Sequence, residues 1–264
     1  MHITQLRNAS IIVDIGAARI LVDPMLAPAA TFAPFGLTNG RYQRNPMVEL
    51  PAATDAALDG VTHCLITHCQ KGHFDHLDRA GKRWLRERRI PVICTPRDGD
   101  YLARRGLAVT PLPQAHAAPS PFLGGTIRTV ACTHGTGVVG RLMEHGVGYL
   151  IEMPGAPRLY LAGDTVLTPA LADFLAHSQP DVCVLPAGGA RFDVGGEIIM
   201  GVDDVLACLR LVRGQVLANH LEALSHCPVR RADLAAAARA AGLHARLHIP
   251  ADGETVSFSA PDLI

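Results

Sequence analysis

The sequence has no excess of charge of either sign. Lysine plus arginine and aspartate plus glutamate number 24 each among 264 residues, and like charges form no long block. A nucleic-acid-binding surface depends on a concentrated basic field, which this charge balance does not supply. We therefore expect no nucleic-acid partner.

Long apolar runs are also missing. No run approaches the ~20 residues that cross a bilayer. The first residues, MHITQLRNASIIVDIG, lack a charged segment followed by an apolar stretch and a cleavage site of small residues. We expect a cytoplasmic protein with no membrane partner.

The cysteines do not form a recognisable framework. There are 7, an odd number without a CxxC pair, and this favours reduced core residues over disulfides. Hydrophobic residues make up 48% of the chain, which is ample for a buried core at this length. No linker-like stretch interrupts the chain, so we predict a single domain over residues 1–264.

Apolar periodicity and turn signals predict an α/β protein with two similar halves. Each half begins with β hairpins and continues with alternating helices and strands. The predicted helices cover residues 79–89, 97–105, 169–177, 202–211 and 231–241. The main predicted strands are HITQL, ASIIVDIG, ARILVDP, VTHCLIT, PVICT, GTIRTVACTH, GVGYLIEM, RLYLAGDT, DVCVLPAGG and QVLANH.

The stretch from residue 25 to residue 60 lacks this periodicity. It is rich in Pro, Ala, Asn and Gly, and it is long for a structureless connection, so it is a candidate functional loop. The same composition also fits a loop that only packs on the surface. The side chains that could line a substrate entrance are Phe32, Phe35, Arg41, Tyr42 and Arg44.

What the chain has in surplus is histidine, with 13 residues. Potential metal donors recur directly after predicted strands: His68, His134, Asp164 and His220. Ligands gather beyond strand ends in sheet-based folds, so these side chains can converge. One such histidine alone is usually structural, but four clusters together favour a metal site with nitrogen and oxygen donors.

The segment THCQKGHFDHLD, residues 67–78, carries the densest cluster. Neighbouring donors in a tight turn, here His73, Asp75 and His76, can reach different ions. A carboxylate such as Asp164 could bridge two ions. A hydroxide shared between metals about 3.5–4 Å apart is a nucleophile at neutral pH.

These motifs resemble those of a known family. HFDHLD, the THG of residues 133–135, LAGDT and the strand-terminal His220 resemble, in order, the motifs of the metallo-β-lactamase superfamily. The opening IIVDIGAARILVDP is most similar to stand-alone bacterial hydrolases near ascorbate-6-phosphate lactonase. The resemblance implies a four-layer αβ/βα sandwich of two mixed β-sheets, with the metals at one edge.

The resemblance also implies the ligands and the activity. One metal would be held by His68, His73 and His134, and a second by Asp75, His76 and His220, with Asp164 bridging. One or two Zn²⁺ ions are expected, although Mn²⁺ or Fe²⁺ fit such donors. The implied activity is metal-dependent hydrolysis of an ester, lactone, amide or phosphodiester. The alternative is a metal-binding or ligand-sensing protein without catalysis.

The chain departs from the usual H-x-H-x-D-H pattern, because CQKG separates His68 from His73. Either CQKG bulges outward, with Gly72 permitting the turn, and His68 still reaches the metal, or that ligand is lost and water replaces it. Lys71 could contact an anionic substrate group or stay solvated. Cys69 could be a soft ligand, but it would face away in an extended segment.

Four further expectations concern residues around the ligands and the substrate. We expect His220 to bind metal and His226 to act as a substrate or proton-donating group, with the exchanged assignment left open. Asp75 is expected to take part in catalysis, and Asp23 to orient a metal-binding histidine. The substrate is expected to be a small molecule, compatible with an anionic one through Arg191, Arg230 and Arg231, and a homo-oligomer is allowed.

Overall fold

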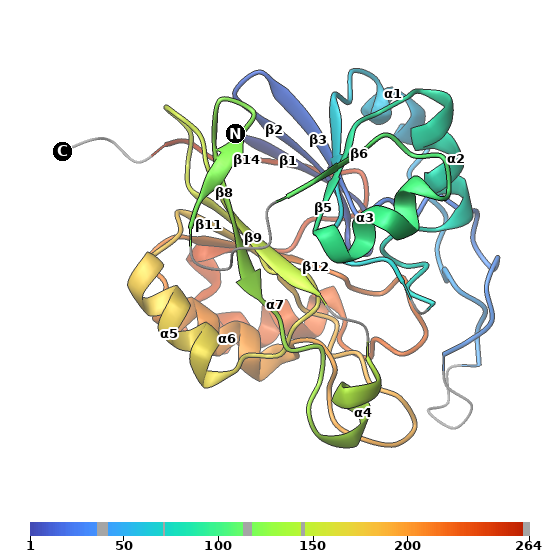
Figure 1. Ribbon diagram of the computed structural model, residues 1–264. Helices are drawn as coiled ribbons and strands as arrows, with labels where there is room; N and C mark the ends of the chain where they lie inside the picture. The colour runs from blue at the N-terminus through green and yellow to red at the C-terminus, as the bar shows by residue number, and fades with distance from the viewer. Residues whose placement is uncertain (36–41, 71, 113–117, 144–145, 261–264) are drawn as a thin grey trace.

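Two seven-stranded β-sheets form the centre of the computed structural model, with helices on their outer faces (Figure 1). The structure describes residues 1–264 except 36–41, 71, 113–117, 144–145 and 261–264. No helix in the described part is long and apolar enough to cross a membrane.

The first sheet has the strand order β14-β1-β2-β3-β4-β5-β6. The pairs from β14 to β3 are antiparallel, and those from β3 to β6 are parallel. Its strands are β1 (His2–Arg7), β2 (Ser10–Ile15), β3 (Ala18–Val22), β4 (His63–Leu65), β5 (Val92–Cys94), β6 (Val109–Pro111) and β14 (Thr255–Ser257).

The second sheet repeats this plan, with the order β13-β12-β11-β10-β9-β8-β7. The pairs from β7 to β10 are antiparallel, and those from β10 to β13 are parallel. Its strands are β7 (Ser120–Phe122), β8 (Gly125–Ala131), β9 (Val147–Glu152), β10 (Leu159–Leu161), β11 (Val182–Pro186), β12 (Gln215–Asn219) and β13 (Leu247–His248).

The helices cover the outer faces because their apolar sides need burial. Leu85 of α2 and Leu102 of α3 pack against Cys64 and Cys94 of the first sheet. Leu175 of α5 belongs to the apolar cluster that covers the outer face of the second sheet. The helices are α1 (Thr54–Leu58), α2 (Arg79–Glu87), α3 (Pro96–Ala103), α4 (Gly137–Leu142), α5 (Pro169–Ser178), α6 (Val202–Leu211) and α7 (Arg231–Ala240), with a 3₁₀ turn at His244–Arg246.

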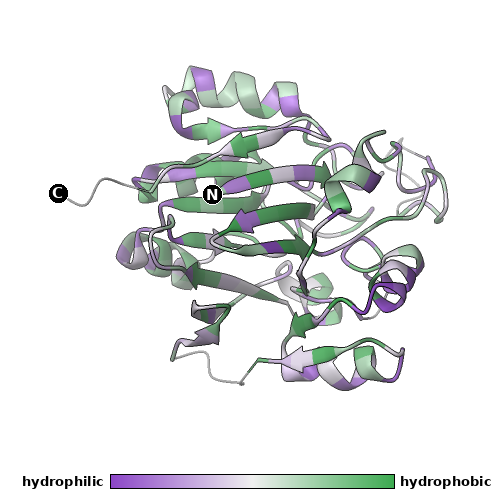
Figure 2. Cartoon of the chain, turned by 90° about the horizontal axis from the view of Figure 1, so that it is seen from above, coloured by the Kyte–Doolittle hydropathy of each residue, from purple (hydrophilic) through white to green (hydrophobic). Residues whose placement is uncertain are grey.

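One apolar cluster joins the facing sides of the two sheets. It contains Ile11 and Val22 from the first sheet and Tyr149, Leu161 and Val184 from the second. In Figure 2 the strands are mostly hydrophobic and the helices carry most of the hydrophilic residues. The four-layer αβ/βα sandwich expected from the family resemblance is thereby confirmed.

The described elements differ from the predicted ones mainly where elements are short. The helix α1 falls inside the stretch predicted to be irregular, and α4 and β7 were not predicted. The five predicted helices all occur, with ends shifted by at most a few residues. Short elements carry too few periods of the apolar pattern to be recognised from sequence.

The long loop after β3 is anchored by a buried arginine. Arg7, fully buried, donates hydrogen bonds to the carbonyls of Met25, Ala27 and Val48. Asp78, the N-cap of α2, accepts from the backbone nitrogens of Ala27 and Gly81. Both ends of the described part of this loop are therefore fixed to the body of the molecule.

Candidate metal centre and active site

The seven predicted ligands converge where strands of both sheets end. His68 follows β4, His134 follows β8, Asp164 follows β10 and His220 follows β12, while the other three lie between β4 and α2. They form two groups in which the ligand atoms lie within 4.8 Å of one another: His68, His73 and His134 in the first, and Asp75, His76, Asp164 and His220 in the second.

The local backbone explains why donors sit at these points. Gly163 has φ +62°, and a Cβ there would lie 2.8 Å from the carbonyl oxygen of Val147, so only glycine lets Asp164 follow β10 so closely. His220 itself has φ +58°, a conformation that costs a non-glycine residue free energy and that clusters at functional sites. Its backbone nitrogen donates to the carbonyl of Asn8.

The first group presents three imidazoles through their Nε2 atoms. Nδ1 of His73 donates to the carbonyl of Gln70 at 2.8 Å, and Nδ1 of His134 donates to that of Ile198 at 2.8 Å. The Thr67 hydroxyl donates to Asp23, so it accepts from Nδ1 of His68 at 3.0 Å. These contacts assign the proton to Nδ1 and leave each Nε2 as a ligand atom.

The second group mixes carboxylates and imidazoles. Oδ2 of Asp164 lies 3.1 Å from Nε2 of His76 and 3.5 Å from Nε2 of His220. Oδ2 of Asp75 lies 3.4 Å from Nε2 of His220. Nδ1 of His76 donates to Oδ2 of Asp23 at 2.8 Å, so Asp23 makes the orienting contact predicted for it.

Asp164 stands between the two groups. The same Oδ2 atom that contacts the second group lies 3.6 Å from Nε2 of His134 in the first. The carboxylate is buried, with 3% of its surface exposed. Its position is the one that a bridging ligand requires.

The two groups differ in their protonation. Burial lowers the pKa of His68 well below its usual value and also lowers that of His134, so both imidazoles are neutral near pH 7. Burial also opposes the charge on His76 and His220, but nearby carboxylates, foremost Asp164, outweigh it and raise the pKa of both well above the usual value. The carboxylates of the second group are therefore balanced by positive charge on His76 and His220.

These residues fit divalent metal ions. Nε2 of His68 is buried and has no hydrogen-bond partner among the described residues, and Nε2 of His73 lies 3.2 Å from Nε2 of His134. Ligands held about 2.0–2.1 Å from a tetrahedral ion lie about 3.3 Å apart, so this spacing suits a shared cation. A cation would likewise supply the positive charge that the carboxylates of the second group require.

The comparisons with known proteins agree with this geometry. A model of the family described as the β-lactamase superfamily domain matches residues 18–220. The chain belongs to the β-lactamase superfamily. YddR of Bacillus subtilis (strain 168), a UPF0173 protein, is 32% identical over 98% of this chain and 100% of its own length. The UPF0173 metal-dependent hydrolase Atu1317 of Agrobacterium fabrum is 26% identical over 98% of this chain and 100% of its own.

Two solved structures resemble this member of the superfamily over its whole length. The isothiocyanate hydrolase from Delia radicum gut bacteria has a TM-score of 0.88 and 30% identity, covering 98% of this chain and 100% of that one. A possible metal-dependent hydrolase from Veillonella parvula has a TM-score of 0.86 and 28% identity, covering 98% and 99%. The chain is a metal-dependent hydrolase, as predicted; the narrower resemblance to ascorbate-6-phosphate lactonase stays a prediction.

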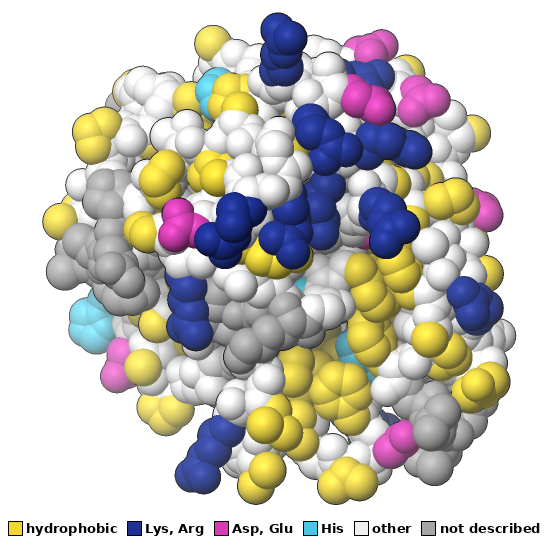
Figure 3. Space-filling model, turned by 45° about the vertical axis from the view of Figure 1, so that its right-hand side comes forward, with side chains coloured by type: hydrophobic (Ala, Val, Ile, Leu, Met, Phe, Trp, Pro, Cys, Tyr) yellow, Lys and Arg dark blue, Asp and Glu magenta, His cyan; other side chains and the backbone are white. Residues whose placement is uncertain are grey.

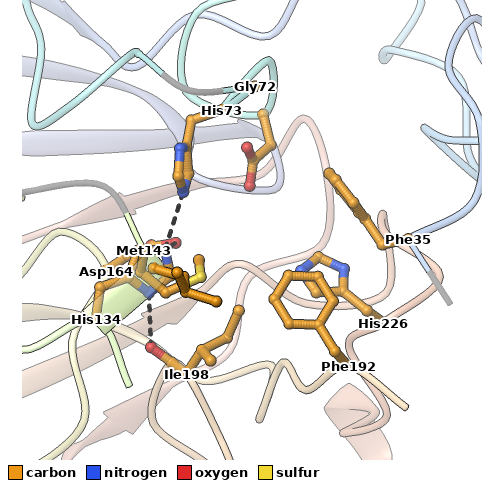
Figure 4. A pocket seen from close by; sticks show the side chains of 11 residues that line it. Phe35, Gly72, His73, His134, Met143, Asp164, Phe192, Ile198 and His226 are labelled. Carbon is orange, nitrogen blue, oxygen red and sulfur yellow. Dashed lines mark hydrogen bonds and ion pairs between the residues drawn. The ribbon is translucent and has the colours of Figure 1, made fainter. Parts of the chain in front are cut away.

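A pocket of about 120 Å³ opens beside the two groups (Figure 4). His73, Asp75, His134 and Asp164 form one wall. The rest of the lining is apolar and consists of Phe35, Leu142, Met143, Phe192 and Ile198; these side chains are called the apolar wall, and in Figure 4 Phe35 and Phe192 lie across the pocket from His73 and His134. On the face that Figure 3 shows, hydrophobic side chains lie around a histidine, and Lys and Arg side chains gather above them.

His226 lines this pocket but belongs to neither ligand group. Its ring lies 4.5 Å from that of Phe35 and 5.8 Å from that of Phe192, between centroids. Burial lowers its pKa to about 4, so the ring is neutral near pH 7. The structure brings His220 into the second group and His226 into the lining of the pocket, and the roles expected of the two histidines stay predictions.

The CQKG segment leaves His68 in place. His68 lies in the first group despite the extra residues, as the bulge interpretation requires, and its metal binding stays a prediction. Cys69 is buried and its Sγ contacts Asp98 at 3.5 Å, so it faces away from the ligands as expected. Lys71 lies outside the described residues.

Of the predicted entrance residues that the structure describes, only Phe35 lines the pocket. Phe32 stacks on Phe74 behind it, with 4.0 Å between centroids. Tyr42 is 72% exposed, and Arg44 donates to the backbone carbonyls of residues 30 and 31. Arg41 lies outside the described residues.

The arginines considered for an anionic substrate do not line the pocket either. The guanidinium group of Arg231 forms ion pairs with Glu222 at 2.6 Å and with Asp252 at 2.5 Å. Arg191 and Arg230 are exposed at the surface.

The apolar wall and one supporting side chain were not predicted from the sequence. Leu142, Met143, Phe192 and Ile198 carry no motif, so nothing in the sequence distinguishes them from other apolar residues. Asn8, whose Nδ2 lies 3.2 Å from Nε2 of His220, was also missed. Its position in the turn between β1 and β2 was the available signal, since asparagine tolerates the φ of +55° found there.

Proposed function

We propose that this hydrolase cleaves a small, neutral, electrophilic molecule with an apolar substituent, and that its substrate is an isothiocyanate. The observation that carries the proposal is the division of the pocket into a ligand wall and an apolar wall. None of the described residues that line it is Lys or Arg. The lining therefore favours a neutral substituent over the anionic one considered from the sequence.

Size and similarity support the same class of substrate. The cavity of about 120 Å³ is close to the ~150 Å³ apolar cavity that binds benzene, so an aryl or short alkyl group fits beside the ligands. The isothiocyanate hydrolase from Delia radicum gut bacteria matches this chain over 98% of its length. An isothiocyanate combines an apolar substituent with an uncharged electrophilic carbon.

The reaction balances without a further reactant. The oxygen of water adds to the central carbon of R–N=C=S, both protons of that water end on nitrogen, and the carbon–nitrogen bond breaks to give R–NH₂ and carbonyl sulfide. The bound metal supplies activation of water and polarisation of the substrate. Zn²⁺ suits the imidazoles of the first group, while the carboxylates of the second also accept Mn²⁺ or Fe²⁺.

Side chains of the pocket handle the protons. Burial raises the pKa of Asp75, but the nearby His76 and His220 outweigh it and lower that pKa, so the side chain is ionised near pH 7 and can accept a hydrogen bond from the attacking water. The neutral ring of His226 has an unpartnered buried Nδ1 and carries one N–H. That N–H can donate to the heteroatom on which negative charge develops.

Turnover of a substrate panel tests the proposal. The protein loaded with Zn²⁺ or Mn²⁺ is given benzyl and methyl isothiocyanate, an acyl ester, a lactone, an amide and a phosphodiester, and amine or acid release is measured. We expect chelator-sensitive turnover with benzyl isothiocyanate preferred. Faster turnover of one of the other substrates would contradict the proposal and identify a different substrate class. Metal binding without turnover of any substrate would favour a metal-binding or ligand-sensing protein without catalysis.

A variant of the apolar wall sharpens this test. Phe192→Ala removes part of the wall without touching a predicted ligand. We expect KM for benzyl isothiocyanate to rise about 10-fold, as losing an aromatic contact of about 1.4 kcal/mol predicts, with little change for methyl isothiocyanate. Phe258→Ala, in the core between the sheets, controls for loss of stability alone.

A further inference from the structure

The backbone carbonyl group of Gln70 holds His73. The Gln70 carbonyl accepts from the backbone nitrogen of His73 at 3.0 Å and from its ring Nδ1 at 2.8 Å. Gly72, the residue before His73, has φ +92°, a left-handed conformation that glycine adopts readily. The extra residues therefore provide the outer partner that fixes the tautomer of a predicted ligand.

The side chain of Gln70 ties the CQKG segment to α3. Its Nε2 donates to Oδ1 of Asp98 at 2.9 Å and to the carbonyl of Arg97 at 3.0 Å. One residue therefore contacts both the predicted ligand and the start of a helix in the outer layer. The orientation of the Gln70 carbonyl depends on where its side chain is held.

Asp98 is the fixed end of this connection. It is fully buried, lies in the first turn of α3 and also contacts the Thr95 hydroxyl at 3.3 Å. The Cys69 thiol donates to Oδ1 of the same carboxylate at 3.5 Å. A buried carboxylate is costly unless it is hydrogen-bonded, and two of its donors come from CQKG.

We infer that Asp98 is a positioning residue for His73: it holds Cys69 and Gln70, and through the Gln70 carbonyl it sets the direction of His73 Nε2 toward the first ligand group. The contacts of Asp98 named above, to Cys69, Gln70 and Thr95, involve no predicted ligand and no described residue that lines the pocket. The segment that departs from the family pattern is on this account a support for the metal site. The inference rests on the metal binding of the first group and not on the identity of the substrate.

Stepwise Zn²⁺ affinities test the inference, measured by competition with a chromophoric chelator in Asp98→Ala and Gln70→Ala. One of the two binding steps is expected to weaken about 10-fold, the lower end of the effect of outer partners, while the other changes less than twofold. Asp100→Ala, an exposed carboxylate on the same helix, is the matched control and should change neither step.

Two further measurements separate positioning from simple support of the fold. Gln70→Glu places a carboxylate against Asp98 and should weaken the same step more than Gln70→Ala. The double variant Gln70→Ala/Asp98→Ala should be no worse than the single variants, since both break one connection. Gln70 is partly exposed, so Gln70→Ala keeps the test decisive even if Asp98→Ala does not fold.

A different pattern of affinities would overturn the inference. If Gln70→Ala lowers Tm but leaves both steps unchanged, Asp98 and Gln70 only stabilise α3. Equal weakening of both steps would mean general disruption of the site. Either result leaves the proposed substrate class standing, because turnover by the unaltered protein is measured separately.

Discussion

The two ligand groups lie side by side but differ in charge. The first consists of three imidazoles, two of which are kept neutral by burial, whereas the second contains two carboxylates that draw protons onto their histidines. An ion in the first group would be held by the geometry of nitrogen donors, and an ion in the second also by opposite charge. The comparison teaches that two neighbouring groups built around histidines can differ in charge, because carboxylates are present in only one of them.

The largest expected effect comes from the residue that joins the groups. Asp164→Ala removes the carboxylate whose Oδ2 lies within 3.6 Å of both His76 and His134. We expect metal content to fall at both groups and kcat/KM to fall at least ~100-fold. Asp173→Ala, an exposed carboxylate on α5, is the control. Loss of only one ion would show that Asp164 belongs to a single group.

Single-ligand variants should separate the groups. His68→Ala and His220→Ala are each expected to lower bound metal by one equivalent per chain, from the first and the second group respectively, and to abolish most of the activity. His226→Ala should keep both ions and lose only rate. Metal analysis after dialysis measures this. Unchanged stoichiometry in His68→Ala would support loss of that ligand through CQKG, and equal loss from His220→Ala and His226→Ala would contradict their assignment.

An orienting carboxylate should have a smaller effect. Asp23→Asn weakens the contact of 2.8 Å that fixes Nδ1 of His76. We expect the affinity of the second group to fall about 10-fold, as for other outer partners. Asp14→Asn, in a surface pair with Arg19, is the matched control. If both ions weaken equally, the contact from Asp23 through Thr67 to His68 matters as much as the direct one.

The smallest effect to measure is proton release. His76 and His220 have raised pKa values without metal, so they are protonated near pH 7 and must release protons when an ion binds. His68 and His134 have lowered pKa values, are already neutral and release none. Calorimetry in buffers of different ionisation enthalpy should show about one proton or more for one binding step only. Equal release in both steps would remove the contrast between the groups.

Much of the fold could be predicted because its signals are local. The apolar runs of β2, β9 and β11 and the amphipathic helices α2 and α6 each carry their own period. The helices α1 and α4 were missed since five or six residues hold too little pattern. The face-to-face packing of the sheets came from the family resemblance, because it depends on contacts between residues far apart in the chain.

The sequence by itself determined which donors are available and where they fall. His68, His134, Asp164 and His220 each follow a strand, and ligands gather beyond the ends of strands in sheet-based folds. Few residue types can bind a metal, so their placement stands out in the sequence.

Only the tertiary structure decided what surrounds these donors. The apolar wall with Phe192 and Ile198, the Ile198 carbonyl that orients His134, and the link from Asp98 to His73 through Gln70 join segments that are distant in sequence. These are ordinary residues and backbone groups, which acquire a role only from their neighbours. The residue types of the ligands can be recognised from short stretches of sequence. Their orientation and the shape of the pocket depend on packing between distant segments.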